Sequence, residues 1–182
     1  MPPSLYTVSE IIAKNITRIE ILLKELLFAN CRQMEFAPTD ICDVINSSVK
    51  KADDRIFLKQ LEISKSYSPG LLVYGNAEKL SLAFLNIIVN AIEAVRAAEG
   101  KIWITAYKRG DYVKIVFKDN GSGMEPDVAS QMFDKNFSAK KNGLGVGLTN
   151  VKDILSRHDA SISVNSEQGT GTSIIITFKA LS

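Results

Sequence analysis

The chain has 182 residues, of which 46% are hydrophobic and 23% charged, which is the composition of a soluble globular domain. A formal net charge of +2 argues against non-specific nucleic-acid binding, which usually needs a strongly basic face. Two cysteines and one histidine exclude a disulfide framework and nearly exclude a zinc site. Because no apolar run reaches about 18 residues and the first residues do not resemble a signal peptide, we expect a reduced, cytoplasmic chain without direct membrane contact, although a longer parent protein could be membrane-anchored.

A long amphipathic helix is predicted over residues 7–30. Thr7 and Glu10 have the spacing of a capping box. Apolar positions then recur at steps of four and three, as in a heptad seam: Val8, Ile12, Ile16, Ile19, Leu23 and Leu26. A helix of this length is not stable alone. It therefore needs a partner, supplied by a helical bundle, a docked helix or a homodimer through residues 7–30.

Strands and helices follow one another along the rest of the chain. Pro38 interrupts the first pattern, and Asp40 is placed to cap a helix running to about Gln60. The further predicted elements are strands over 61–67, 71–74, 101–108, 112–118, 161–165 and 172–179, a short helix from Pro126 to about Phe133, a loop over 134–147 and a helix over 146–158. This order predicts an α+β domain with helices layered on one face of a mixed sheet.

A helix capped by Asn76 and ending at Gly100 has the most informative pattern. It is apolar nearly all round, which predicts burial, yet Asn86, Asn90 and Glu93 fall on one stripe at i, i+4 and i+7. The residues expected on the other side are Leu85, Ile88, Val89, Ile92 and Val95. Buried polar groups need partners, so the stripe indicates either a polar network in the core or the wall of a polar ligand site.

Three glycine-rich turns follow this helix. In residues 119–123, Asp-Asn-Gly-Ser-Gly, the glycines let the backbone approach a ligand, and the aspartate can accept from an amine such as that of adenine, although many ordinary turns look similar. Residues 140–148, Lys-Lys-Asn-Gly-Leu-Gly-Val-Gly-Leu, lead into a helix N-terminus that favours an anion, after a loop long enough to be a lid. Residues 169–172, Gly-Thr-Gly-Thr, enter the last predicted strand and would bring Thr172 near the same ligand.

The order of these motifs resembles the ATP-binding domain of two-component sensor histidine kinases, within the wider ATPase group of gyrase, heat-shock protein 90, histidine kinases and MutL. The resemblance covers about residues 37–178, and the Asn-Ala-Ile-Glu-Ala box is nitrogen-regulator-like. It implies a Bergerat fold, a two-layer α/β sandwich with a mixed, mostly antiparallel sheet covered by helices on one face, here preceded by the long N-terminal helix. Residues 1–32 would be the second helix of a dimerisation and phosphotransfer hairpin, and residues 33–182 the catalytic domain that binds ATP with Mg²⁺.

The resemblance also implies roles for single residues. Asn90 would ligate Mg²⁺, Asn86 would act one turn earlier, and Asp119 would read adenine. Lys140 would reach the phosphates from the lid, completing a catalytic set with the two asparagines. For Glu93 a solvated ion pair with Arg96 is an equal alternative to a nucleotide contact. The remaining nucleotide-binding positions are Glu93, Gly121, Gly123, Met124, Phe137, Gly143, Leu144, Gly145, Val146, Gly147, Leu148 and Thr172, with Phe133 and Phe137 as the aromatic lid box.

One position separates hydrolysis from transfer. Relatives that hydrolyse ATP resemble each other in placing a glutamate one turn before the Mg²⁺ asparagine, whereas this chain has Asn86, which cannot act as a general base. The γ-phosphoryl group would then be held for another nucleophile. We therefore expect a protein-histidine kinase domain that phosphorylates a histidine on a dimerisation hairpin absent from this chain, for relay to a response-regulator receiver domain. The alternatives are a non-catalytic ATP-responsive binding module and a serine kinase of the anti-sigma type.

The sole histidine, His158, is followed by Asp159, as an acceptor histidine usually is followed by an acidic residue. It ends a predicted helix just before a strand, however, where this family commonly has a structural turn, and a basic residue suits the end of a helix. We therefore interpret His158 as structural and expect the acceptor histidine in cis in a longer parent protein or in trans.

Overall fold

The computed structural model describes residues 35–133 and 146–181. The predictions for residues 1–34, for residues 134–145 and for Ser182 lie outside the described residues. The long helix over residues 7–30 and the domain boundary after residue 32 therefore stay predictions. From Phe36 onward, the described residues belong to one compact unit.

A five-stranded sheet forms one layer of this unit, with the strand order β2-β4-β5-β7-β6. Its strands are β2 (Glu62–Tyr67), β4 (Lys101–Arg109), β5 (Tyr112–Asp119), β6 (Ser161–Glu167) and β7 (Gly171–Lys179). β2 runs parallel to β4, and the other three pairs of neighbours are antiparallel. The sheet is therefore mixed and mostly antiparallel, as predicted.

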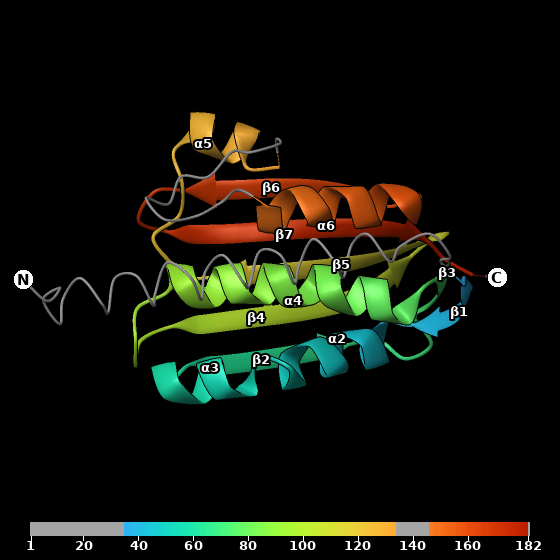
Figure 1. Cartoon of the computed structure of the whole chain (residues 1–182), viewed down its shortest axis with the longest axis horizontal. Coiled ribbons are helices and arrows are strands. Elements are labelled where there is room, and N and C mark those ends of the chain that lie inside the picture. Colours follow the sequence, from blue (N-terminus) through green and yellow to red (C-terminus); the bar gives the residue numbers. More distant parts are fainter. Residues whose placement is uncertain (1–34, 134–145, 182) are drawn as a thin grey trace, which may run out of the picture. The chain divides into compact units, whose positions relative to one another are not determined.

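Helices form the second layer and cover one face of the sheet (Figure 1). They are α2 (Ile41–Lys50), α3 (Asp53–Lys59), α4 (Ala77–Ala94), α5 (Pro126–Gln131) and α6 (Val146–Arg157). α4 lies between α2 and α6 and contacts both, whereas α5 contacts β6 at the edge of the sheet. The arrangement confirms the predicted α+β class and its two-layer sandwich.

The core lies between these two layers. Every second residue of the three central strands is buried on the helix side: Ile102, Ile104, Ala106, Val113, Ile115, Phe117, Ile174, Ile176 and Phe178. Phe84 of α4 is fully buried and its ring centroid lies 5.4 Å from that of Phe117 on β5. Burying a side chain of this size stabilises the fold by about 1.5–3 kcal/mol, so these contacts hold α4 firmly against the sheet.

The second predicted helix is correct at its start and wrong at its end. The side chain of Asp40 accepts a hydrogen bond from the amide of Cys42 at 2.7 Å, which confirms the predicted cap. The helix does not run to Gln60, because it ends at Lys50 and α3 begins at Asp53, with Ala52 buried between them. Lysines end α2 and aspartates start α3, a distribution of charge that suits two separate helix dipoles.

A short strand was not predicted. β1 (Ala37–Asp40) pairs antiparallel with β3 (Leu72–Gly75) in a separate two-stranded sheet. Pro38 lies within β1, and proline is compatible with an edge strand because its missing N–H can face away from the pair. The proline therefore marks an edge strand here and not only the end of a helix.

α4 is shorter than predicted, since it ends at Ala94 and not near Gly100. Val95 is extended and buried, and Ala98 adopts a positive φ of 61°. The sequence Arg-Ala-Ala-Glu favours helix, so tertiary contacts override local propensity at this point. In the described ranges, no helix is both long and apolar enough to cross a bilayer.

Candidate functional site

α4 presents a half-exposed polar stripe along its length. The side chain of Asn76 caps the helix by accepting from the amide of Lys79 at 2.9 Å, as predicted. Asn86 and Asn90 are half-buried and Glu93 is exposed. The buried side of the helix consists of Leu80, Ser81, Ala83, Phe84, Ile87, Ile88, Ala91 and Ile92.

The stripe is therefore not a polar network enclosed in the core. Two residues predicted on its opposite side, Leu85 and Val89, are also only half-buried and border the asparagines. The half-burial of both asparagines is compatible with the wall of a ligand site, and that interpretation stays a prediction.

The first turn of α6 lies beside this stripe. A Cβ on Gly147 would lie 4.0 Å from Oδ1 of Asn86. The first amides of a helix have no partner within the helix, and they form the positive end of its dipole. The start of α6 and the carboxamide of Asn86 thus lie where the predicted phosphate loop ends.

Only part of that loop falls within the described residues. Gly147 and Leu148 are half-buried in the first turn of α6, and the backbone of Val146 begins the helix. The other predicted lid and loop residues lie outside the described residues: Phe137, Lys140, Gly143, Leu144 and Gly145.

Asp119, at the end of β5, has one carboxylate oxygen held by the protein. Its Oδ1 accepts from the amides of Gly121 at 2.8 Å and Thr172 at 3.3 Å, and Thr172 is its partner on β7. Although the residue is only 6% exposed, its Oδ2 accepts no hydrogen bond within the described ranges. Among the described residues, the Tyr67 hydroxyl is the side-chain polar atom that is fully buried without a hydrogen-bond partner. Oδ2 of Asp119 has no partner among these residues but is not fully buried, so it keeps access to solvent.

Burial raises the pKa of Asp119 above its ordinary value, and the two backbone amides oppose this shift. The carboxyl group thus carries a desolvation cost when it is ionised. An amine that donates to the free oxygen would lower that cost. One oxygen of Asp119 is thus fixed by the backbone, whereas acceptance from a ligand at the other oxygen stays a prediction.

The glycines beside Asp119 are required by contacts within the protein. A Cβ on Gly121 would lie 2.8 Å from the carbonyl of Ala94, at the end of α4. Gly123 has a φ of +61°, and a Cβ there would collide with the carbonyl of Glu167. Close packing explains both glycines, whereas the passage of a ligand beside them stays a prediction.

Thr172 is buried beside Asp119, and its hydroxyl lies 2.9 Å from that of Ser166. The sequence reasoning missed Ser166, because its proximity to Thr172 depends on the register of β6 against β7. Met124 and Phe133, also predicted to line the site or its lid, are half-buried.

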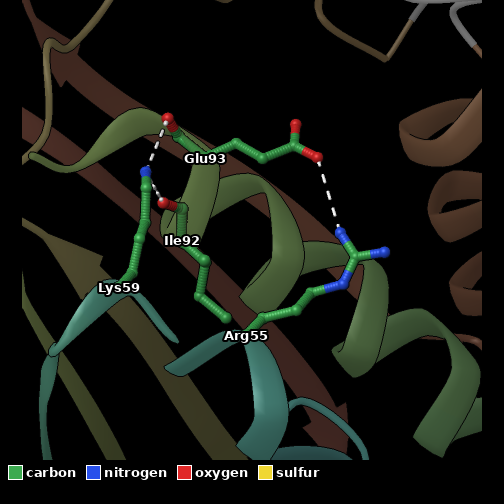
Figure 2. A network of polar contacts seen from close by, with 4 residues as sticks. All are labelled: Arg55, Lys59, Ile92 and Glu93. Carbon is green, nitrogen blue, oxygen red and sulfur yellow. Dashed lines mark hydrogen bonds and ion pairs between the residues drawn. The ribbon is translucent and has the colours of Figure 1, made fainter. Parts of the chain in front are cut away.

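Glu93 forms an ion pair with Arg55 of α3, at 3.9 Å between the charged atoms (Figure 2). The two side chains are 44% and 56% exposed, respectively, so this pair contributes little to stability. The sequence offered Arg96 as the alternative partner, and the structure adds Arg55. Its predicted contact with a nucleotide stays a prediction.

His158 is buried and both of its ring nitrogens are engaged. Nε2 accepts from the amide of Asn76 at 3.0 Å, and Nδ1 lies 2.7 Å from the carbonyl of Ile154, to which it donates. Burial lowers the pKa of His158, so the neutral ring is favoured. This geometry supports the structural interpretation of the residue, which links α6 to the start of α4.

The described residues fit a nucleotide better than a metal held by protein alone. They contain no group of three or more His, Cys, Asp or Glu side chains able to hold a metal. Mg²⁺ is often bound through few protein oxygens together with substrate phosphates. The carboxamide oxygens of Asn86 and Asn90 suit that role, and the free oxygen of Asp119 suits an amine.

A shallow hollow of about 390 Å³ lies elsewhere, lined by Arg109, Tyr112, Lys114 and Thr177. Tyr112 begins β5, whereas Asp119 ends it. The hollow therefore lies at the opposite end of that strand from the candidate site and contains none of the predicted site residues.

Residues 75–182, more than half of the chain, match the family of histidine kinase-, DNA gyrase B- and HSP90-like ATPases. The chain therefore belongs to this family, and these residues contain its ATP-binding domain.

Relatives of the chain are named as kinases. Sporulation kinase B of Bacillus subtilis is 37% identical over 122 residues, which cover 67% of this chain and 28% of the relative. Sensory histidine kinase/phosphatase NtrB of Rhodobacter capsulatus is 32% identical over 176 residues, which cover 88% and 49%. The chain thus spans less than half the length of both.

Among solved structures, the mycobacterial sensor histidine kinase MprB superposes with a TM-score of 0.73 at 25% identity, covering 80% of this chain and 98% of that one. This similarity confirms that the sandwich of α4, α6 and the five-stranded sheet is the catalytic-domain fold of histidine kinases.

Proposed function

We propose that this chain is the catalytic part of a sensor histidine kinase. It binds ATP with Mg²⁺ and transfers the γ-phosphoryl group to a histidine on a dimerisation hairpin, for relay to the receiver domain of a response regulator. Membership of the ATPase family supports the binding of ATP, and the names of the relatives, which are kinases, support phosphoryl transfer. The observation that carries the proposal is the carboxylate of Asp119, with one oxygen fixed by two amides and the other free for a ligand.

The proposed roles combine the family resemblance with the positions of the residues. Asp119 accepts from the amino group of the base, and Thr172 closes the same end of the site. The carboxamide oxygens of Asn86 and Asn90 would hold the metal and the phosphates, and Oδ1 of Asn86 lies next to the first turn of α6. Lys140 and the glycines of residues 143–147 would contact the phosphates. ATP supplies the activated phosphoryl group, and the chain contributes position and neutralisation of charge.

Asn86 decides between hydrolysis and transfer. A carboxamide cannot take a proton from water, so the site lacks a general base at that position. In the transfer, an acceptor imidazole nitrogen bonds to the γ-phosphorus, the bond to the bridging oxygen breaks, ADP leaves, and the imidazole proton passes to solvent. The acceptor is not His158, because that ring is buried with both nitrogens engaged.

The acceptor histidine is therefore supplied by another segment, in cis in a longer parent protein or in trans. Residues 1–32 suit the second helix of the hairpin, and residues 7–30 would form the contact of a homodimer. We place this catalytic part in the cytoplasm, where ATP is available.

The test combines the chain with a separately produced acceptor hairpin and γ-labelled ATP. We expect acid-labile label on the hairpin, and none on a hairpin whose acceptor histidine is replaced by glutamine. Acid-stable label on a serine protein would instead indicate a serine kinase. Tight nucleotide binding without transfer would indicate a binding module. Either of these results would overturn the proposal.

A further inference from the structure

The C-terminal end of α4 is capped by a lysine from another helix. The last turn of α4, which is fully described, carries no basic residue of its own. Instead, Nζ of Lys59 donates to the carbonyl of Ile92 at 2.6 Å, with a longer bond of 3.5 Å to that of Glu93 (Figure 2). It also donates to the carbonyl of Val95 at 2.8 Å. An ammonium group at this end of a helix satisfies unpaired carbonyls and complements the helix dipole.

Lys59 also holds this region through its main chain. Its carbonyl accepts from the amide of Ala98 at 2.9 Å, in the connection between α4 and β4. The neighbouring ion pair between Arg55 and Glu93 is longer and more exposed. Lys59 therefore makes close contacts on both sides of the point where α4 ends.

The same helix end holds the loop that carries Asp119. The carbonyl of Ala94, the last residue of α4, accepts from the amide of Ser122 at 3.1 Å. Gly121 packs against that carbonyl, and its amide is bonded to Asp119. The last turn of α4 thus contacts Lys59 of α3 on one side and the loop of residues 119–123, which follows β5, on the other.

Asn90 lies one turn before this end, and Asn86 lies two turns before it. If the last turn frays, its carbonyls turn to solvent and the anchor of Ser122 on Ala94 shifts with them. The spacing between Asp119 and the two asparagines would then no longer be fixed. A ligand that reaches both ends of the site depends on that spacing, whereas one that reaches only Asp119 does not.

We propose that Lys59 is a positioning residue for nucleotide binding, which fixes the end of α4 and thereby the distance between Asp119 and the asparagine stripe. This inference rests on the function proposed above for the same site. Lys59 acts through Ala94 and Ser122, not by contact with the nucleotide. It therefore contributes to the affinity for Mg·ATP and not to that for adenosine.

The experiment compares Lys59→Met, which keeps an unbranched stem, with Lys59→Arg, which keeps a cation and donors. Lys51→Met is the matched control, because Nζ of Lys51 donates to the hydroxyl of Ser81 at 2.9 Å, in the first half of the same helix. Affinity is measured on the whole chain, by calorimetry for Mg·ATP and by chemical-shift titration for adenosine. Urea unfolding establishes that each variant is folded, and Lys59→Gln, which keeps one donor, replaces Lys59→Met if that variant is not.

We expect Lys59→Met to weaken Mg·ATP binding at least fivefold while adenosine binding stays within twofold. Lys59→Arg should restore Mg·ATP binding to within twofold of wild type, and Lys51→Met should change neither affinity. An equal loss for both ligands, or lower stability with an unchanged ratio of affinities, would reduce Lys59 to a structural residue and overturn the inference. If the wild-type chain binds no nucleotide, the proposed function fails as well; if it binds and the ratio does not move, the inference on Lys59 fails alone.

Discussion

Replacing Asp119 with asparagine tests the recognition of the base while keeping the local structure. Asparagine retains Oδ1, the atom that accepts from Gly121 and Thr172. The substitution changes only Oδ2, which becomes an amino group. The side-chain NH2 of asparagine would then face the amino group of the proposed ligand. Both groups donate hydrogen bonds, so the bond accepted by Oδ2 would be lost.

The structure sets the expected size of the effect. A hydrogen bond to a charged group contributes about 1.5–3 kcal/mol, so Asp119→Asn should weaken ATP binding about tenfold to a hundredfold. Asp119→Ala should have a similar effect on binding but also destabilise the fold by at least about 2 kcal/mol, because it leaves two buried amides without an acceptor. The asparagine variant should remain within about 1 kcal/mol of the wild-type stability.

The pH dependence of stability gives a second check on the same substitution. Burial raises the folded-state pKa of Asp119, so the ionised carboxylate costs stability as the pH rises from the unfolded-state pKa through the folded-state pKa. Asp119→Asn removes this cost. Relative to wild type it should gain stability at neutral pH and lose that gain in acid.

Calorimetric titration with Mg·ATP, paired with urea unfolding between pH 4 and pH 7, measures both effects. Wild-type affinity in a folded Asp119→Asn variant would refute the assignment of the free oxygen to the ligand. A large loss of stability in the asparagine variant would refute the geometry from which the magnitude is derived.

Three further predictions concern other residues. Burial lowers the folded-state pKa of His158. Urea titrations should therefore show stability falling as the pH drops below about 6.5, by at most about 1.4 kcal/mol per pH unit. The same slope in a His158→Gln variant would contradict this. Gly123→Ala should cost more than about 3 kcal/mol, because the new Cβ collides with Glu167, whereas Gly110→Ala, at a similar φ in open space, should cost about 1–2 kcal/mol; equal losses in thermal unfolding would disprove the collision. Asn86→Glu should raise ATP hydrolysis at least tenfold in a phosphate-release assay, since a positioned general base contributes about 10²–10⁴, and an unchanged rate would show that residue 86 does not face the γ-phosphate.

The fold was predictable where local patterns and tertiary contacts agree. The alternation of Ile102 and Ile104 on β4 and the caps at Asp40 and Asn76 correctly predicted the strand and both helix starts. The end of α4 was predicted wrongly, because the capping group is the side chain of Lys59, distant in sequence. No local signal marks that contact.

The break between α2 and α3 left a signal that could have been used. Lys50 and Lys51 are followed by Asp53 and Asp54, an inversion of charge that suits the end of one helix and the start of another. β1 was missed for a different reason. Its pairing with β3 joins residues that are far apart in the sequence, and Pro38 indicates a break when it is considered alone.

For the candidate site, the sequence predicts a set of residues whose binding roles stay predictions, and it does not predict their geometry. Helical spacing correctly placed Asn86 and Asn90 on one stripe, but it misjudged Leu85 and Val89, which border the stripe. The proximity of Thr172 to Asp119 follows from the register of β5 against β7, which the glycine motifs do not specify. The contact between Gly121 and Ala94 likewise appears only when α4 is packed on the sheet.

The most direct test of the site is a calorimetric titration of ATP into wild-type protein and an Asn90→Ala variant, with and without Mg²⁺. The wild type should bind one nucleotide, and more tightly when Mg²⁺ is present. Asn90→Ala should bind at least tenfold more weakly, a loss of about 1.4 kcal/mol, and should lose most of the Mg²⁺ dependence. Equal affinity and equal Mg²⁺ dependence in the two proteins would contradict the placement of the metal and phosphates on α4.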